Sequence, residues 1–211
     1  MSLPKRDLAA HCRALASCRR CGHPDNIAPI VSAAVRPKAM LVGQAPGQVE
    51  TAGGKPFAGR AGKTLFRWLE RAGVDEETFR SRIYIAAITR CYPGPSPSGR
   101  GDRVPSTAEQ ENCAVWLEDE LRLTRPRLLI PVGRLAIERF LPRLPLDQLI
   151  GRSFEVEHVG GKSLAIPLPH PSGASSWIHQ GNHPKLLDRA LALIGDQLRP
   201  LTIGSLSRSV A

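Results

Sequence analysis

Four of the five cysteines in this chain form a set that could hold a metal. Cys18 and Cys21 make a CxxC pair with two arginines between them, and Cys91 and Cys113 follow further along. Four thiolates of this kind suit a tetrahedral zinc ion or a cubane iron–sulfur cluster, and the residues alone favour neither. Scattered buried thiols are the alternative, which the CxxC pair disfavours. Cys12 has no comparable partner and is predicted to be a core residue of the first helix.

A second candidate for chemistry is the histidine of Pro169-His170-Pro171-Ser172. It directly follows an apolar run, Leu164–Leu168, which reads as a strand. A histidine in this place would lie at the carboxyl edge of a parallel sheet, and the prolines on both sides would stiffen its backbone. Considered alone, the motif is equally compatible with an ordinary surface turn.

The third stretch is Met40–Leu69, which changes from an apolar run to a glycine-rich loop and then to a helical pattern. Gly43 and Gly47 flank a proline, and the aromatic Phe57 lies inside the loop. Strand, glycine loop and helix is the arrangement with which α/β proteins hold a ligand at the carboxyl end of a strand. The order of the glycines matches neither a phosphate loop nor a dinucleotide fingerprint.

The remaining pattern supplies the elements that must position these residues. Strands alternate with helices, which predicts a parallel sheet covered on both faces. We therefore expect a three-layer α/β/α sandwich with a central, mainly parallel four-stranded sheet, in a single domain over 1–211 with a frayed tail beyond about residue 200. The predicted strands are 38–42, 82–88, 128–132 and 164–168, with an extended edge at 154–159, and the main helices are 4–15, 62–72, 107–123 and 183–198.

Charge points to an anionic partner. Lys and Arg number 29 against 19 for Asp and Glu, a net charge of +10. Nucleic acid is the commonest partner of so basic a chain, ahead of a membrane surface or an acidic protein, and a surface kept basic for solubility is the alternative. We find no signal peptide and no apolar run long enough for a membrane span, so a cytoplasmic location is expected, where disulfides are rare.

The order of the motif residues narrows the reading. GQAPGQVE followed by GKPFAGRAG resembles motif 1 of the family 4, iron–sulfur uracil-DNA glycosylases, which reads GEAPGxxE and GxPFxGRAG. The HPS sequence at 170–172 resembles motif 2 of the same family. The four cysteines match the family's ligand positions in order, so the resemblance implies a [4Fe-4S] cluster with a structural role, and zinc becomes the less favoured occupant.

The resemblance also implies roles for particular residues. His170 would hydrogen-bond O2 of uracil and stabilise the charge that develops when the base leaves. Phe57 would stack on the flipped base, beside the main chain of the loop. The uracil-binding residues implied are Gly43, Gln44, Ala45, Phe57 and His170; the residues expected to contact DNA are Arg60, Lys63, Arg100, Arg103, Ser172, Gly173, Ala174 and Ser175.

The chain departs from family 4 at three places. Gln44 replaces the glutamate of GEAPG, and Ala87 stands where an asparagine reads the uracil edge; the strand holding Ala87 is more similar to family 5. Family 5 has an acid after the FxG of motif 1, where this chain has Arg60. Glu50 is the acid that motif 1 retains, so with Gln44 and His170 it is the predicted catalytic set. The segment 92–112 is longer than the family 4 linker and has no histidine for covalent sugar trapping.

The sequence therefore predicts a monomeric, monofunctional uracil-DNA glycosylase that acts on uracil-containing DNA and leaves an abasic site. A non-catalytic cluster protein that binds uracil-containing or abasic DNA is the alternative, because Gln44 and Ala87 replace residues that family 4 uses. A zinc-stapled DNA-binding protein without a base pocket is a third reading, which Phe57 and His170 disfavour.

Overall fold

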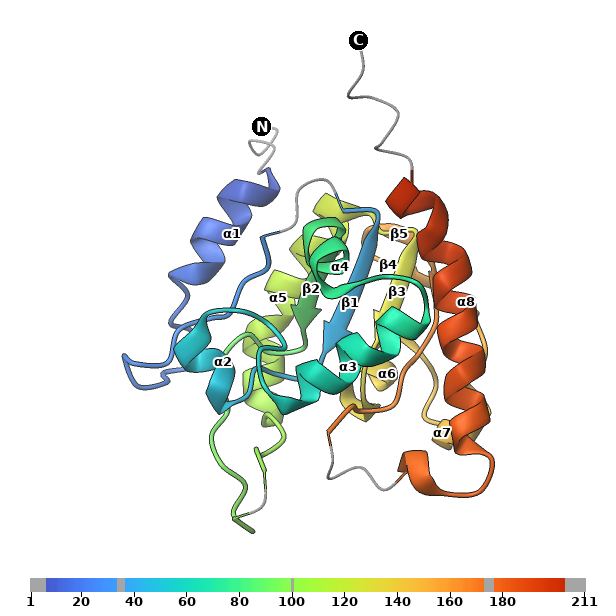
Figure 1. Ribbon diagram of the computed structural model, residues 1–211. Helices are drawn as coiled ribbons and strands as arrows, with labels where there is room; N and C mark the ends of the chain where they lie inside the picture. Colours follow the sequence, from blue (N-terminus) through green and yellow to red (C-terminus); the bar gives the residue numbers. More distant parts are fainter. Residues whose placement is uncertain (1–6, 34–36, 100, 173–176, 204–211) are drawn as a thin grey trace.

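The computed structural model describes residues 7–33, 37–99, 101–172 and 177–203, and its centre is one mixed sheet (Figure 1). The strands lie in the order β2-β1-β3-β5-β4. Neighbours are parallel except for the hairpin of β4 and β5. The strands are β1 (Ala39–Gly43), β2 (Ile83–Ala87), β3 (Leu128–Pro131), β4 (Phe154–His158) and β5 (Gly161–Ala165).

Helices cover both faces of this sheet. In Figure 1, α3, α4 and α8 lie together on the near face, and α5 lies on the far face with α1 packed outside it. The helices are α1 (Leu8–Ala16), α2 (Gln48–Gly53), α3 (Arg60–Arg71), α4 (Glu76–Arg82), α5 (Thr107–Thr124), α6 (Arg134–Phe140), α7 (Leu146–Leu149) and α8 (His183–Ile203), with a 3-10 turn, η1, at Trp177–His179. In the described part of the chain, no helix combines the length and the apolar character that crossing a membrane requires.

The central strands are apolar throughout because they are buried on both sides. Every residue of β1 and β3 is buried, and the core continues into the inner faces of α3 and α8. The pairing extends past the strand ends: Ile88 N donates to Gly43 O at 3.0 Å, and Val132 N to Val42 O at 2.8 Å. These bonds fix the carboxyl edge of the sheet, where the loops after β1, β2, β3 and β5 meet.

The predicted three-layer α/β/α class and mainly parallel sheet are confirmed, but the sheet has five strands where four were predicted. The expected extended edge at 154–159 is a true strand, β4, because its backbone pairs with β5 over Phe154–His158. The fourth predicted strand, 164–168, overlaps the regular strand β5 only at 164–165. Beyond it, Ile166 N and Leu168 N still donate to Leu129 O and Pro131 O of β3, both at 2.9 Å, and Leu168 forms a bridge to Val132. The short helices α2, α4 and α7 were not predicted.

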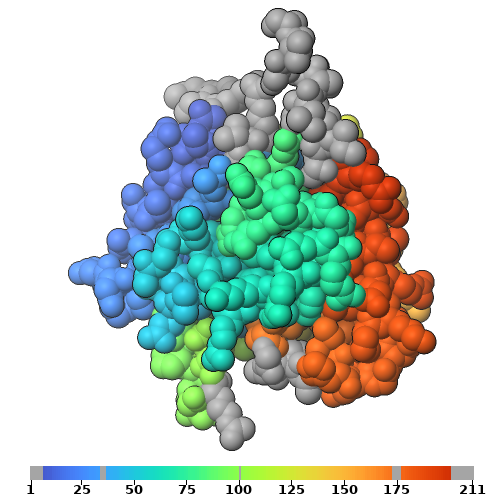
Figure 2. All heavy atoms as spheres, in the orientation of Figure 1, coloured from blue at the N-terminus to red at the C-terminus, as the bar shows by residue number. Residues whose placement is uncertain are grey.

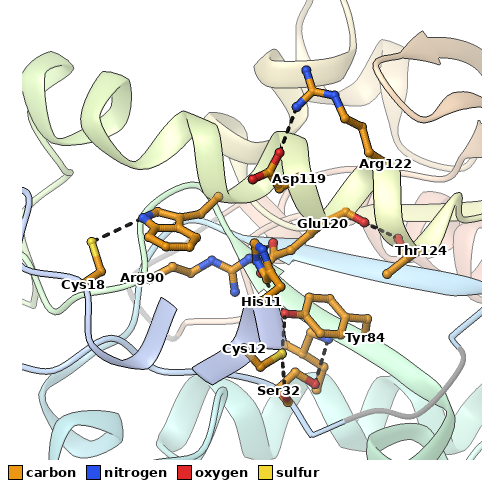
Figure 3. Close-up of polar contacts among 12 residues, drawn as sticks. His11, Cys12, Cys18, Ser32, Tyr84, Arg90, Asp119, Glu120, Arg122 and Thr124 are labelled. Carbon is orange, nitrogen blue, oxygen red and sulfur yellow. Dashed lines mark hydrogen bonds and ion pairs between the residues drawn. The ribbon is translucent and has the colours of Figure 1, made fainter. Parts of the chain in front are cut away.

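A buried polar network fastens the N-terminal helix to the sheet (Figure 3). Glu120 of α5 accepts hydrogen bonds from the guanidinium of Arg90 and, at 2.7 Å, from the hydroxyl of Tyr84 on β2. His11 Nε2 of α1 lies 3.5 Å from the same carboxylate. All four side chains are buried. Burial disfavours a charged guanidinium, yet Glu120 holds the pKa of Arg90 above its ordinary value. The ion pair therefore holds the end of β2 against α5, and His11 of α1 packs against it.

Replacing Glu120 by glutamine should destabilise the protein strongly, because Arg90 would keep its charge in the interior without a counter-ion. Breaking one side of a buried pair costs about 3–5 kcal/mol, which urea unfolding would measure. The neighbouring Asp119→Asn is the control, since Asp119 forms an exposed pair with Arg122 and should change stability by less than about 1 kcal/mol. Equal losses in the two variants would contradict the role given to the buried pair.

Candidate active site

A cavity of about 320 Å³ opens at the carboxyl edge of the sheet. Its walls come from the loop after β1, the ends of β2 and β3, and the segment after β5. This size is typical of a small-molecule pocket. The predicted residues that it brings together are Gly43, Gln44, Ala45, Glu50, Phe57, Arg60 and His170.

The loop that carries Phe57 is held in an unusual conformation. Phe57 has φ of +55°, a region that non-glycine residues seldom occupy, and Arg80 of α4 donates to its carbonyl at 3.2 Å and to that of Pro56 at 2.8 Å. The Phe57 carbonyl oxygen would lie only 1.8 Å from a Cβ on Gly62, so a side chain at Gly62 would displace the loop. The ring itself packs on Gly43, where a Cβ would approach its Cζ to 3.0 Å. These contacts fix the aromatic ring against the end of β1, inside the cavity.

Glu50 secures the other end of the same loop. Its two carboxylate oxygens accept the backbone N–H groups of Gly47, at 3.0 Å, and of Gly59, at 2.9 Å. The side chain is 8% exposed and belongs to α2, the short helix inside the loop. Glu50 therefore bridges the start of α2 and the start of α3. The role of Glu50 in positioning water or base stays a prediction, and both of its oxygens already accept hydrogen bonds from the backbone.

His170 lines the cavity, and its local hydrogen bonds define which ring nitrogen is the acceptor. The backbone N–H of Ser172 points at Nδ1 of His170 at 3.2 Å, and the Ser172 hydroxyl lies 2.9 Å from the same atom. Because an N–H can only donate, Nδ1 is the acceptor, and in the neutral ring Nε2 carries the hydrogen. Burial lowers the pKa of His170, while Asp102 opposes that shift. The ring packs on Gly133, where a Cβ would approach Cδ2 to 3.0 Å. His170 is thus a neutral donor at the sheet edge.

The four predicted metal ligands surround a second, small cavity on the other side of Arg90. Cys18, Cys21, Cys91 and Cys113 all line it, and the indole N–H of Trp116 donates to Cys18 Sγ at 3.3 Å. Burial, together with the neighbouring cysteines, raises the pKa of Cys91 to about 12. The four side chains surround the cavity without closing on one point: within the described ranges, no three His, Cys, Asp or Glu side chains have the spacing of a metal site.

Comparison with known proteins places the chain in a family. A model of the uracil DNA glycosylase superfamily matches residues 30–194, most of the chain. The chain belongs to the uracil DNA glycosylase superfamily. The resemblance drawn from the motifs is thereby confirmed.

Individual relatives agree with this placement. The type-4 uracil-DNA glycosylase of Archaeoglobus fulgidus is 31% identical over 167 residues, covering 76% of this chain and 79% of the relative. The type-4 enzyme of Thermotoga maritima is 29% identical over 133 residues, covering 63% of this chain and 64% of the relative. A type-5 uracil-DNA glycosylase of Pyrobaculum aerophilum is 30% identical over 148 residues, with 64% and 61% covered. Similarity to both types fits the mixed motifs.

The departures from the family 4 motifs fall inside the site. Gln44 and Ala87 both line the cavity, so the missing glutamate and asparagine are missing from the pocket itself. The superfamily site of this chain must therefore work without these two side chains. The two replacements were identified from the sequence, but not the residues that surround them in the cavity.

The predicted DNA-contacting residues have different outcomes. Arg60 and Lys63 are exposed on the first turn of α3, where they are free to meet a phosphate backbone. Arg103 is instead committed to Glu109, with two hydrogen bonds of 2.6 and 2.7 Å that lower the pKa of that carboxyl to about 2. The Ser172 hydroxyl faces His170. Arg100, Gly173, Ala174 and Ser175 lie outside the described residues.

Two functional candidates were missed by sequence reasoning. Gly133, which gives room to the His170 ring, has φ of +83°, and its position directly after an apolar strand was an available signal. Asp102 lines the same cavity, although it comes from the segment between Cys91 and Cys113. Nothing local marked it, because hairpin pairing between Pro95 and Asp102 brings it there. In Figure 2 the lime atoms of this segment lie against the cyan atoms of the motif loop.

Proposed function

We propose that this protein is a monofunctional uracil-DNA glycosylase, which flips deoxyuridine out of DNA, hydrolyses its N-glycosidic bond and leaves an abasic site in base excision repair. The observation that carries the proposal is the His170 ring: its Nδ1 is occupied by Ser172, and its neutral Nε2–H is left for a ligand in a cavity that Phe57 lines. The family placement and the relatives named type-4 uracil-DNA glycosylases support the same activity.

The chemistry follows from where charge develops. When the bond between C1′ and N1 breaks, its electron pair leaves with the base, and the negative charge concentrates on O2. A fixed donor at this oxygen stabilises the transition state more than the ground state. Nε2–H of His170 supplies that donor, and backbone groups of Gly43, Gln44 and Ala45 surround the same space. The Phe57 ring offers a flat apolar face for the pyrimidine.

DNA would reach the cavity along α3. A groove of about 390 Å³ lies beside His170 and is lined by Arg67, Arg71 and His179 among others. Arg60 and Lys63 extend the same basic surface. Cationic side chains contact the phosphate backbone and position a duplex without reading its sequence. The groove therefore suits the strand that flanks a flipped nucleotide.

We also propose that the four cysteines hold a [4Fe-4S] cluster, with zinc as the less favoured occupant. The donor set fits: four thiols from three segments line one cavity. Thr89 lines it too, and its buried hydroxyl has no hydrogen-bond partner among the described residues, so a sulfide-bearing group would supply one. The role would be structural, holding the CxxC segment to the end of β2 and to α5. The monomeric state, the cytoplasmic location and the single-domain organisation stay predictions.

The proposed function is tested by single-turnover reaction with an oligonucleotide containing one deoxyuridine, followed by alkali. We expect strand breaks only after alkali, because hydrolysis without a lyase step leaves an intact backbone at the abasic site. A thymidine oligonucleotide of the same sequence is the control. Tight binding of the deoxyuridine strand with no product would refute the enzymatic activity. It would favour the alternative of a non-catalytic protein that binds uracil-containing DNA, which the replacements at Gln44 and Ala87 support.

His170→Ala should slow single-turnover cleavage by about 10²–10³-fold, the usual cost of removing one donor from a developing oxyanion. His158→Ala is a suitable control, because His158 lies at the β4–β5 turn, where its ring bonds to Gly160 and Ser163 of the same hairpin. Near-normal cleavage by His170→Ala would assign the stabilisation of the leaving base to another group.

The purified protein should be brown, with the broad absorbance at about 400 nm that [4Fe-4S] clusters give, and should contain iron. Cys113→Ser should lose colour and iron, whereas Cys12→Ser should keep both, because Cys12 packs between Ser32 and Tyr84 away from the other four. A colourless preparation that contains zinc would refute the cluster.

A further inference from the structure

We infer that Asp102 is the catalytic acid–base residue of this protein, accepting the proton of the water that attacks the sugar. The inference rests on the proposed function and deepens it. It assigns to the segment between Cys91 and Cys113 the acid that motif 1 lacks at Gln44.

The cavity offers a short set of carboxylates. Among the described residues that line it, only Glu50 and Asp102 are acids. Both oxygens of Glu50 accept backbone N–H groups, from Gly47 and Gly59, so moving this side chain to a water would release the loop that it holds. The amide of Gln44 cannot take up a proton at neutral pH. Asp102 remains as the group able to do so.

Hydrogen bonds on both sides of Asp102 fix its position. The backbone of the segment closes into a hairpin, with Ser96 N donating to Gly101 O at 2.9 Å and Arg103 N to Gly94 O at 3.0 Å. Arg103, the next residue, is fastened to Glu109 at the start of α5 by two hydrogen bonds. Asp102 is therefore held between two anchored points and set against the motif loop.

The surroundings of its carboxylate suit a base. Oδ2 would lie 3.0 Å from a Cβ on Gly47, so the absence of a side chain there leaves it room beside the loop. Burial and three neighbouring groups bear on its charge. Partial burial raises its pKa, as does Glu50 of α2, whereas a hydrogen bond from Tyr92 and the nearby His170 lower it. Asp102 is exposed at the cavity mouth and so remains accessible to water.

The step balances without any further reactant. The C1′–N1 bond breaks, and its electron pair leaves on the base, whose O2 faces Nε2–H of His170. The water oxygen bonds to C1′, and one water proton passes to the Asp102 carboxylate. That proton then leaves to solvent or to the departing base, which restores the carboxylate. A general base in such a step contributes about 10²–10⁴-fold.

The test compares Asp102→Asn with the wild-type protein in single-turnover cleavage of the deoxyuridine oligonucleotide at saturating protein. We expect a loss of at least about 10²-fold in rate, while binding of the same oligonucleotide, measured by fluorescence anisotropy, stays within about threefold. Ser98→Ala, a change in the same hairpin away from the cavity, is the matched control and should cleave at the wild-type rate.

The pH profile separates this role from a structural one. Protonating Asp102 removes the base, so the wild-type rate should fall as pH drops through the pKa of this carboxyl, and Asp102→Asn should lack that limb; a limb due to His170 would persist in both proteins. Asp102→Glu, which keeps a carboxylate, should recover part of the lost rate.

Several results would overturn the assignment. Cleavage by Asp102→Asn at the wild-type rate would do so, as would a defect confined to binding, or an equal defect in Asp102→Glu and Asp102→Asn. A wild-type protein that does not cleave at all is a different result, because it refutes the proposed function itself.

Discussion

The buried ion pair between Arg90 and Glu120 is the constraint on which both cavities depend. Arg90 follows β2 and lines both the cavity that holds Phe57 and His170 and the cavity that the four cysteines surround. Its carbonyl accepts the N–H of Ile30 at 2.8 Å, which draws in the segment after the CxxC pair. A buried charge is stable only with a partner, so α5 must place Glu120 at this point. The fold is thereby fixed where its two sites meet.

The two carboxylates of the cavity, Glu50 and Asp102, have different roles. Glu50 is buried and spends its oxygens on Gly47 and Gly59, which converts a flexible glycine loop into a rigid wall for Phe57. Asp102 reaches the cavity on a hairpin whose bridge, Pro95 with Asp102, lies outside the main sheet. A loop that must hold its shape and a group that must exchange a proton make opposite demands on a carboxylate, and here separate segments meet them.

The sequence was a good guide wherever structure depends on local pattern. Buried strands are apolar throughout, so β1, β2 and β3 were predicted within about a residue. The helix predicted over 107–123 matches α5 equally well, and in the structure a capping box at Ser106 starts it. Helix α2 was not predicted, because its residues lie within the stretch that the glycine spacing indicated to be a loop. The cavity's parts were foreseen from motif order. Two contacts matter most for its chemistry, and neither leaves a periodic signal. Arg103 and Glu109 lie only six residues apart but join the hairpin to the start of α5, whereas Asp102 and the motif loop come from segments far apart in sequence.

The segment that follows β2 explains how a cluster with a purely structural role would affect the base pocket. Ala87 lines the cavity that holds Phe57 and His170, Thr89 and Cys91 line the cysteine cavity, and Arg90 lines both, all within five residues. A cluster bound by Cys91 and Cys113 would hold this segment from one side while Glu120 holds it from the other. Because this segment lines the base pocket, the shape of the pocket depends on where the segment is held. Rigidity here serves catalysis directly, because a donor displaced by about 1 Å can lose much of its effect on a transition state.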